Sequence, residues 1–263
     1  MTGGRDRGAN NGTIRLLQVT DTHLHASPQA MMNGVNVDAS LRAVVESARG
    51  LPRPLDAVLA TGDLVHDESR AGYQRLRSIL GDLAAKVYCL PGNHDDPRIM
   101  REVFGPPGFQ FCGLADFGHW CVVLLSTHLP GEDSGLLDPD ALVMLDRILS
   151  EKPDRHVLIS LHHPPVPVGS PWLDEIGLEN SADLLASISR HNNVRGVLCG
   201  HVHQAFDRVI DGVRFMTTPS TCFQFVPFSD TFVVDGRPPG FRWLELERDG
   251  GIRTDVGRLS GAG

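Results

Sequence analysis

No run of apolar residues in this chain approaches the ~20 that a membrane-spanning helix needs, so no membrane association is expected. Basic residues are also scarce, because 24 lysines and arginines against 32 aspartates and glutamates give a formal net charge of −8. A nucleic-acid partner is therefore not expected, since binding a polyanion requires clustered basic side chains. The five cysteines, an odd number, show no Cys-x-x-Cys spacing. Most lie in or beside apolar runs, which predicts buried free thiols and a reducing compartment, the cytoplasm.

The beginning of the chain lacks the apolar segment of a secretory signal peptide. Residues 1–12 are rich in glycine, arginine and asparagine, and we expect them to form a disordered lead-in. No linker or internal repeat divides the remainder, so residues 13–259 are predicted to form a single domain. A chain of 263 residues can bury a sizeable core.

Short apolar runs alternate with amphipathic stretches along much of the chain. Strands are expected at residues 14–19, 57–60, 87–90, 121–126, 157–161 and 196–199. Helices are expected between them at 37–48, 68–83, 139–149 and 181–191. This rhythm of strand, helix and strand predicts parallel strands joined by helical crossovers.

The pattern changes after Gly200, where apolar runs recur without helices between them. They lie at residues 206–210, 214–217, 231–234 and 241–247. Such runs are typical of antiparallel strands, and Asp211-Gly212 predicts a two-residue hairpin turn between the first two. One α/β domain with two packed sheets is therefore expected.

Five polar clusters directly follow predicted strands. They are Asp21-Thr22-His23, Gly62-Asp63, Gly92-Asn93-His94-Asp95, His162-His163-Pro164 and Gly200-His201-Val202-His203. In open α/β sheets, ligands bind outside the carboxyl ends of the strands, where side chains remote in sequence meet. Carboxylate, amide and imidazole ligands suit a pair of hard to borderline divalent metals. The natural chemistry of such a pair is attack of a metal-bridging hydroxide on a phosphoester.

In this order the motifs D-x-H, G-D, G-N-H-D, H-x-P and G-H-x-H resemble those of the calcineurin-like metallophosphoesterases. The resemblance covers roughly residues 14–257. It implies the metallo-dependent phosphatase fold, a four-layer α/β/β/α sandwich in which helices flank two mixed β-sheets. It also implies a dinuclear metal centre that hydrolyses phosphoesters.

The resemblance assigns a role to each matching residue. One metal would be held by Asp21, His23 and His203, the other by Asn93, His162 and His201, and Asp63 would bridge the two. The catalytic residues would be His94, Asp63 and Asn93, and the substrate would contact His23, Asn93, His94 and His203. His94 would stabilise the phosphoryl group or protonate the departing alkoxide. The metals can be iron, manganese, zinc or cobalt, because ligand type alone does not choose among them.

The remaining histidines require separate interpretation. In the family the ligand is the histidine two residues before the proline, which favours His162 over His163 and makes His163 a neighbour of the site. His25 and His66 match no ligand position of the family, so we expect them to support the site indirectly or to face solvent. Four others are expected to have structural roles only: His119, His128, His156 and His191.

Further segments are similar to the bacterial class III 3′,5′-cyclic-AMP phosphodiesterases. They are residues 61–67, 161–165, 170–174, 198–204, 218–225 and 238–242. This resemblance implies that the substrate is a small cyclic nucleotide and that the reaction converts 3′,5′-cyclic AMP to 5′-AMP. Two alternatives stay open. One is a broad phosphodiesterase acting on glycerophosphodiesters or 2′,3′-cyclic nucleotides, and the other is a non-catalytic scaffold of the same fold.

Three aromatic residues are candidates for contact with the base: Trp172, Phe223 and Phe225. Their rings can bury area and stack on a purine. Phe223 and Phe225 also alternate along the chain, which is equally typical of residues that face a core. The sequence leaves the oligomeric state open between a monomer and a homodimer.

Overall fold

Two mixed β-sheets form the centre of the molecule. The computed structural model describes residues 12–51, 54–84 and 86–260, so the predicted lead-in at residues 1–12 lies outside the described residues except for Gly12. The first sheet has the order β16 (Ile252–Arg258), β15 (Gly240–Leu246), β1 (Ile14–Val19), β4 (Ala57–Thr61), β5 (Val87–Leu90) and β6 (Phe109–Phe111). The second has the order β11 (Phe206–Ile210), β12 (Val213–Thr217), β10 (Val194–Cys199), β9 (His156–Ser160), β8 (Trp120–Leu124) and β7 (Gly113–Asp116).

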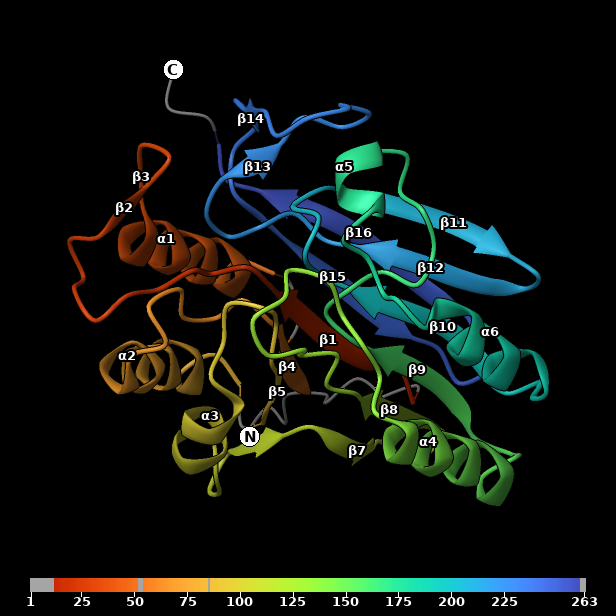
Figure 1. The fold of residues 1–263 in the computed structure, drawn as a ribbon. Coiled ribbons are helices and arrows are strands. Elements are labelled where there is room, and N and C mark those ends of the chain that lie inside the picture. The colour runs from red at the N-terminus through yellow and green to blue at the C-terminus, as the bar shows by residue number, and fades with distance from the viewer. Residues whose placement is uncertain (1–11, 52–53, 85, 261–263) are drawn as a thin grey trace, which may run out of the picture.

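Helices cover the outer faces of the two sheets. They are α1 (Val37–Arg49), α2 (Arg70–Gly81), α3 (Pro97–Val103), α4 (Pro139–Glu151), α5 (Pro171–Asp174) and α6 (Ser181–Ser189). Helices α1, α2 and α3 lie on one side of the molecule and α4 and α6 on the opposite side, with the sheets between them (Figure 1). The predicted four-layer α/β/β/α sandwich is confirmed.

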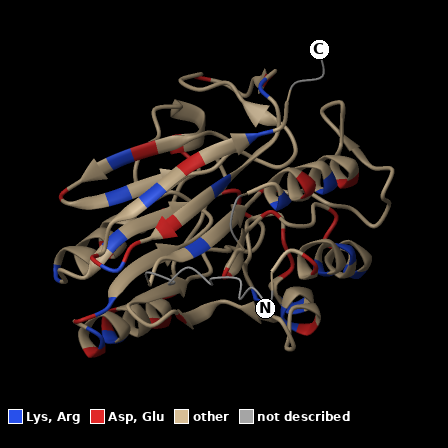
Figure 2. Cartoon of the chain, turned by 180° about the vertical axis from the view of Figure 1, so that it is seen from behind, with Lys and Arg blue, Asp and Glu red and all other residues tan. Residues whose placement is uncertain are grey.

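Two short hairpins complete the described elements. One pairs β2 (Met31–Met32) with β3 (Val35–Asn36), and the other pairs β13 (Gln224–Phe225) with β14 (Val234–Asp235). Seen from behind, acidic and basic residues are interspersed along the strands and helices (Figure 2). Among the described residues, no helix is both long enough and apolar enough to cross a membrane.

Alternate residues of the strands fill the space between the sheets. Ile14 and Leu16 of β1 belong to one buried cluster with Leu158 of β9 and Leu198 of β10. Trp120 at the start of β8 is completely buried in this cluster, and its indole N–H donates to the carbonyl of Glu247 at 2.7 Å. Apolar burial between the sheets thus fixes how they face each other.

Towards the carboxyl ends of β1 and β10, the contact between the sheets becomes polar. The Gln18 side chain donates to the hydroxyl of Thr61 at 2.8 Å and to the carbonyl of Cys199, on the second sheet, at 3.0 Å. Arg242 of β15, only 2% exposed, donates to the carbonyl of Thr217 on β12 at 2.9 Å. Burial lowers the pKa of this guanidinium to about 10. These hydrogen bonds connect the two sheets immediately below the edge where the polar clusters lie.

Most of the predicted elements are present, with boundaries shifted by one or two residues. The Asp211-Gly212 turn joins β11 to β12 as expected, although β12 also pairs parallel with β10. The strand predicted at 231–234 is wrong, because only Val234 and Asp235 pair with another strand, and residues 231–233 are irregular. The sequence analysis missed β16, which pairs antiparallel with β15, because its charged residues interrupt any apolar run. All five cysteines are free, and all except the half-buried Cys112 are buried.

Arg242 provides a test of the polar contact between the sheets. Arg242→Ala removes the donor from buried oxygen atoms, and we expect it to lower the free energy of unfolding by about 3 kcal/mol. The control is Arg253→Ala, which removes a 65% exposed side chain paired with Glu245, and we expect a loss below about 1 kcal/mol. Urea denaturation followed by circular dichroism measures both. Equal losses for the two variants would contradict the structural role of Arg242.

Candidate metal centre

The five polar clusters meet at one edge of the molecule. Strands β1, β4 and β5 are parallel neighbours in the first sheet, and β9 and β10 are parallel neighbours in the second. The clusters follow the carboxyl ends of these strands, as the sequence predicted. Of the seven predicted ligands, six are buried and one is half-buried: Asp21, His23, Asp63, His162, His201 and His203, and then Asn93.

Five of the seven predicted ligands have a left-handed backbone. Their φ angles are 53° at Asp21, 45° at His23, 51° at Asp63, 70° at His201 and 48° at His203. Residues other than glycine rarely adopt this conformation, which costs on the order of 1–3 kcal/mol for each residue. Strained backbone conformations clustered at one edge are typical of a functional site, where the direction of the side chains is maintained at a cost in conformational energy.

Two glycines allow the strand ends to approach one another closely. A Cβ atom on Gly92 would lie 2.1 Å from Oδ1 of Asp63, and one on Gly200 would lie 2.2 Å from the hydroxyl of Thr20. Neither position has room for a side chain. Glycine at both positions therefore permits the close approach of neighbouring strand ends.

One group of candidate ligands contains Asp21, His23 and His203. Their ligand atoms all lie within 4.8 Å of one another. Nε2 of His203 is 3.3 Å from Oδ1 of Asp21 and 3.2 Å from Nε2 of His23. A carboxylate and two imidazoles at this spacing can hold a divalent cation.

Asp63 connects this group to a second one. Its Oδ2 lies 3.9 Å from Nε2 of His23, and its Oδ1 lies 3.4 Å from Nε2 of His162. The two oxygens of one carboxylate therefore face different sets of histidines. The rings of His162 and His201 are 5.2 Å apart, so the second set lies beside the first.

Several buried polar atoms in this region have no partner. They are Oδ1 of Asn93, Nε2 of His162 and Nε2 of His201. Buried polar atoms are normally hydrogen-bonded, and three unpaired ones near a shared carboxylate indicate that something else satisfies them. All three atom types bind divalent metals, so this donor set fits a second cation beside Asp63.

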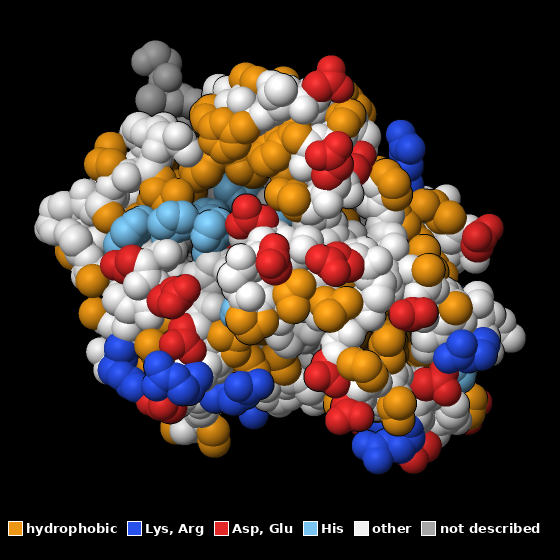
Figure 3. Space-filling view, viewed as in Figure 1, with side chains coloured by type: hydrophobic (Ala, Val, Ile, Leu, Met, Phe, Trp, Pro, Cys, Tyr) orange, Lys and Arg blue, Asp and Glu red, His pale blue; other side chains and the backbone are white. Residues whose placement is uncertain are grey.

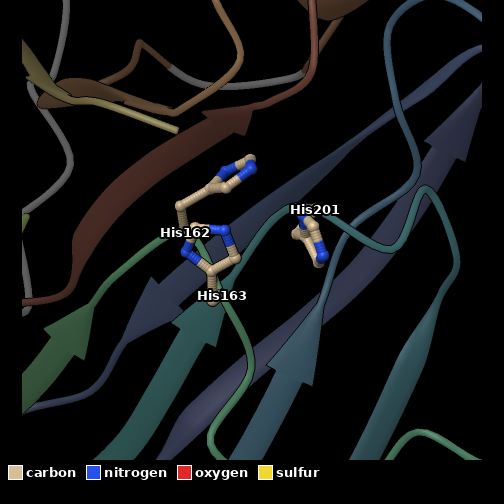
Figure 4. Close-up of side chains that lie close together, drawn as sticks. All are labelled: His162, His163 and His201. Carbon is tan, nitrogen blue, oxygen red and sulfur yellow. The ribbon is translucent and has the colours of Figure 1, made fainter. Parts of the chain in front are cut away.

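His163 also offers a nitrogen near His162 and His201, so the choice between the two neighbouring histidines needs evidence (Figure 4). Both nitrogens of His163 have partners. Nδ1 accepts from the Thr127 hydroxyl at 2.7 Å, and Nε2–H donates to the carbonyl of Asp133 at 3.2 Å. His162 differs, because its Nε2 is unpaired and faces the carboxylates. The hydrogen bonds therefore favour His162 as the ligand. His163 instead binds the loop that contains Thr127 and Asp133.

Carbonyl groups orient two of the candidate ligand rings. Nδ1–H of His162 donates to the carbonyl of Thr61 at 2.8 Å, and Nδ1–H of His203 donates to that of Phe223 at 2.8 Å. A carbonyl can only accept, so Nδ1 of each ring carries a proton and Nε2 is the nitrogen turned toward the candidate site, where it can bind a metal. Nδ1 of His23 lies 3.3 Å from Nδ1 of His66 instead. His66 thus contacts a candidate ligand, which agrees with the prediction that it supports the site indirectly rather than facing solvent.

Asp95, to which the sequence analysis gave no role, fixes the loop that carries Asn93 and His94. Its carboxylate accepts the backbone N–H groups of Gly92, Leu64 and Val65 at 2.9 to 3.1 Å. The Tyr73 hydroxyl donates to it at 3.0 Å. Burial and the charge of Asp63 raise the pKa of Asp95 to about 6, although the N–H groups oppose this shift. The backbone N–H of His94 donates to Oδ1 of Asp63 at 3.0 Å, which joins this loop to the shared carboxylate.

The electrostatics of the region suit cation binding. Burial lowers the pKa of both His23 and His201 to about 3, so their rings are neutral and available as ligands. Burial acts the same way on His162, but Asp63 and Asp21 outweigh it and raise the pKa of this ring to about 9, so a cation at Nε2 would take the place of a proton shared with Asp63. The same pairing holds the pKa of Asp63 well below its usual range despite burial. Two ionised carboxylates thus lie buried among imidazoles.

A cavity of about 350 Å³ opens onto this region. Candidate ligands and His94 line it together with apolar side chains, including the predicted base contacts Trp172, Phe223 and Phe225. Phe223 and Phe225 adjoin the ring of His203, with centroid distances of 4.9 and 4.4 Å. Histidines lie next to a hollow bordered by hydrophobic side chains (Figure 3). The sequence analysis missed Met32 and Phe232, which also line the cavity. No lysine or arginine is among the described residues that line it.

Comparison with known proteins agrees with this site. A model of the calcineurin-like phosphoesterase family matches residues 14–205. The chain belongs to the calcineurin-like phosphoesterase family. Members of this family use a dinuclear metal centre, and the two groups of candidate ligands joined by Asp63 suit such a centre.

Within the calcineurin-like phosphoesterases, three relatives match nearly the whole chain. The 3′,5′-cyclic adenosine monophosphate phosphodiesterase CpdA of Pseudomonas aeruginosa is 40% identical, covering 95% of this chain and 92% of its own. CpdA of Escherichia coli strain K12 is 38% identical, covering 96% and 92%. A 3′,5′-cyclic-nucleotide phosphodiesterase of Nostoc is 37% identical, covering 94% and 92%.

Two solved structures share the fold at low sequence identity. A dimetal phosphatase from Danio rerio matches with a TM-score of 0.62 and 15% identity, covering 94% of this chain and 99% of that one. A purple acid phosphatase from yellow lupin matches with a TM-score of 0.66 and 13% identity, covering 94% and 51%. At this identity the likeness shows the fold alone.

Metal content distinguishes the two neighbouring histidines. His162→Ala removes an unpaired nitrogen beside Asp63, and we expect the metal-reconstituted protein to bind about one ion fewer per chain than the unchanged protein. His163→Ala removes hydrogen bonds to Thr127 and Asp133, so we expect a lower Tm with the metal content retained. Elemental analysis and thermal unfolding of both variants measure these effects. Greater metal loss in His163→Ala than in His162→Ala would reverse the assignment.

Proposed function

We propose that this protein hydrolyses 3′,5′-cyclic AMP to 5′-AMP with a dinuclear metal centre. The observation that carries the proposal is the single cavity that joins the two groups of candidate ligands to an aromatic wall. A cyclic nucleotide has matching parts, because a charged phosphodiester lies at one end and a flat base at the other. The CpdA phosphodiesterases, at 38–40% identity over nearly the whole chain, support the same substrate.

In this proposal every predicted ligand keeps its place. One cation would be held by Asp21, His23 and His203, the other by Asn93, His162 and His201, and Asp63 would contribute a ligand to both. The spacing of Asp21, His23 and His203, the unpaired atoms of Asn93, His162 and His201, and the two directions in which the Asp63 oxygens face support this assignment. When bound, the two cations supply Lewis acidity to the phosphoryl oxygens and lower the pKa of the attacking water.

The chain's own residues bind and orient the substrate. His94 lines the cavity beside Asn93, and its backbone N–H donates to Asp63, so its ring is placed to stabilise the charged phosphoryl group or to protonate the departing O3′. No lysine or arginine is among the described residues that line the cavity. Histidines are therefore the basic side chains available to the substrate there. His23 and His203 border the same space and complete the proposed substrate contacts.

The metals are iron, manganese, zinc or cobalt, since the oxygen and nitrogen donors suit each of them. We further propose that residues 13–259 form one domain and that the protein acts in the cytoplasm. Five free thiols, four of them buried, support a reducing compartment.

A substrate panel tests the activity directly. Protein reconstituted with manganese, iron, zinc or cobalt is assayed with 3′,5′-cyclic AMP, a 2′,3′-cyclic nucleotide and glycerophosphoethanolamine. We expect the highest kcat/KM for 3′,5′-cyclic AMP, with 5′-AMP as the product. Turnover of another diester without turnover of cyclic AMP would establish the broad phosphodiesterase instead. No turnover with any metal, together with fewer than two bound ions, would indicate a non-catalytic scaffold.

The bridging role of Asp63 is tested by removing its carboxylate. Asp63→Ala should abolish activity and reduce metal content, because both groups of ligands lose the oxygen between them. Asp67→Ala is the control, since Asp67 is a nearby exposed carboxylate outside the cavity lining, and it should leave both quantities unchanged. Normal metal loading in Asp63→Ala would contradict the bridge.

Removal of His94 is expected to lower activity without lowering metal content, unlike removal of Asp63. His94→Ala should lower kcat by roughly 10²–10⁴-fold, the usual contribution of a positioned proton donor, while both metals stay bound. Parallel elemental analysis and steady-state kinetics measure the two effects. Loss of metal from this variant would mean that His94 is itself a ligand.

A further inference from the structure

Three aromatic rings, those of Trp172, Phe225 and Phe232, form one wall of the cavity. Trp172 meets Phe225 edge-on, with ring centroids 4.9 Å apart and planes at 83°. Phe232 lies 5.7 Å from Trp172 and 5.2 Å from Phe225, at 66° to each. Each ring thus presents either a face or an edge to its neighbours, as aromatic clusters usually do.

This wall is continuous with the proposed metal ligands. Phe225 stacks on the ring of His203 with centroids 4.4 Å apart and planes at 19°. Phe225 is nearly fully buried, so it acts as a spacer between His203 and the more exposed Phe232.

Phe232 is unusual because it is large, apolar and 54% exposed at the mouth of the cavity. It belongs to the irregular segment between β13 and β14, where the backbone N–H of Val226 donates to the carbonyl of Val233 at 2.9 Å. This hydrogen bond closes the segment and holds Phe232 beside Trp172. The next two residues, Val233 and Val234, are also exposed, at 43% and 40%, and an apolar surface of this kind beside a cavity is typical of a ligand-binding groove.

We propose that Phe232 and Trp172 are the specificity-determining residues that bind the nucleobase. The inference rests on the proposed cyclic-nucleotide activity and names how the same site selects its substrate. A flat base can lie against the face of one ring while its rim touches the other, because the two planes meet at 66°.

The same geometry determines which bases are accepted. The aromatic wall consists of ring faces and aliphatic groups together with the indole N–H of Trp172, which is buried and has no hydrogen-bond partner; Asn33 and Asp133 add polar side chains to the lining outside the proposed metal ligands and their neighbouring histidines. The indole can donate to a ring nitrogen that adenine and guanine share. Stacking depends on the π-face that every base has, not on its hydrogen-bonding edge. The enzyme therefore selects diesters that carry a base over glycerophosphodiesters, and it discriminates only weakly between adenine and guanine.

Phe228 provides a matched control for Phe232. It is a phenylalanine of the same segment and is 73% exposed, but it does not line the cavity. Phe232→Ala should lower kcat/KM for 3′,5′-cyclic AMP and for 3′,5′-cyclic GMP by about 10-fold through KM, the size expected for one lost stacking contact. Phe228→Ala should leave both values unchanged, and Phe232→Tyr should restore them.

Turnover of glycerophosphoethanolamine, which has no nucleobase, should be the same in all these variants. Equal effects of Phe232→Ala and Phe228→Ala, or an equal loss with the substrate that has no base, would overturn the inference. A preference above about 100-fold for one purine would overturn its statement about base tolerance, since such a ratio requires hydrogen bonds to the base edge.

A binding measurement separates this inference from the proposed activity. Calorimetry with the metal-reconstituted protein compares 5′-AMP with ribose 5-phosphate, which has the same phosphate and lacks the base. We expect 5′-AMP to bind about 10-fold more tightly, and Phe232→Ala to remove most of that difference. Equal affinities would refute the base site even if cyclic AMP is hydrolysed. A preserved difference without hydrolysis of cyclic AMP would refute the proposed activity alone.

Discussion

The carboxylate of Asp63 is the interaction on which the rest of the site depends. One of its oxygens faces His162 and the other faces His23, while the backbone N–H of His94 also donates to it. It lies so close to the next strand end that Gly92 has no room for a side chain. A buried carboxylate is costly to desolvate, and here imidazoles surround it and hold its pKa low. The neighbouring strand ends are thus arranged around a single charged group.

Beneath the site, polar contacts add to the apolar core in holding the two sheets together. Gln18 and Arg242 connect the two sheets directly below the ligands, and Asp95 gathers the N–H groups of two strand ends. Each of these groups is buried and hydrogen-bonded, so a shift of one strand end would break several hydrogen bonds together. This coupling lets residues from both sheets keep spacings as short as those around Asp63.

The sequence was sufficient to predict the layered fold and the residues that gather at its edge. Both depend on local signals, since apolar periodicity marks the strands and a short polar motif follows each strand end. It was insufficient where a residue acts through partners remote in sequence. Asp95 binds backbone N–H groups that no motif encodes, His66 contacts His23 across two loops, and β16 is a strand only because β15 pairs with it. Phe232 was assigned to a strand because its neighbours are apolar, whereas the fold uses that apolarity at the mouth of the cavity.

The left-handed backbone at five of the predicted ligands has an evolutionary consequence. At each of these positions glycine would relieve the conformational strain, and an uncharged residue at Asp21 or Asp63 would also remove a buried charge. Substitutions that lower the conformational energy of the backbone at these positions would therefore remove predicted ligands. A lineage released from the need for turnover would lose these side chains early and keep its fold. The intact set in this chain is what continued selection for catalysis would leave behind.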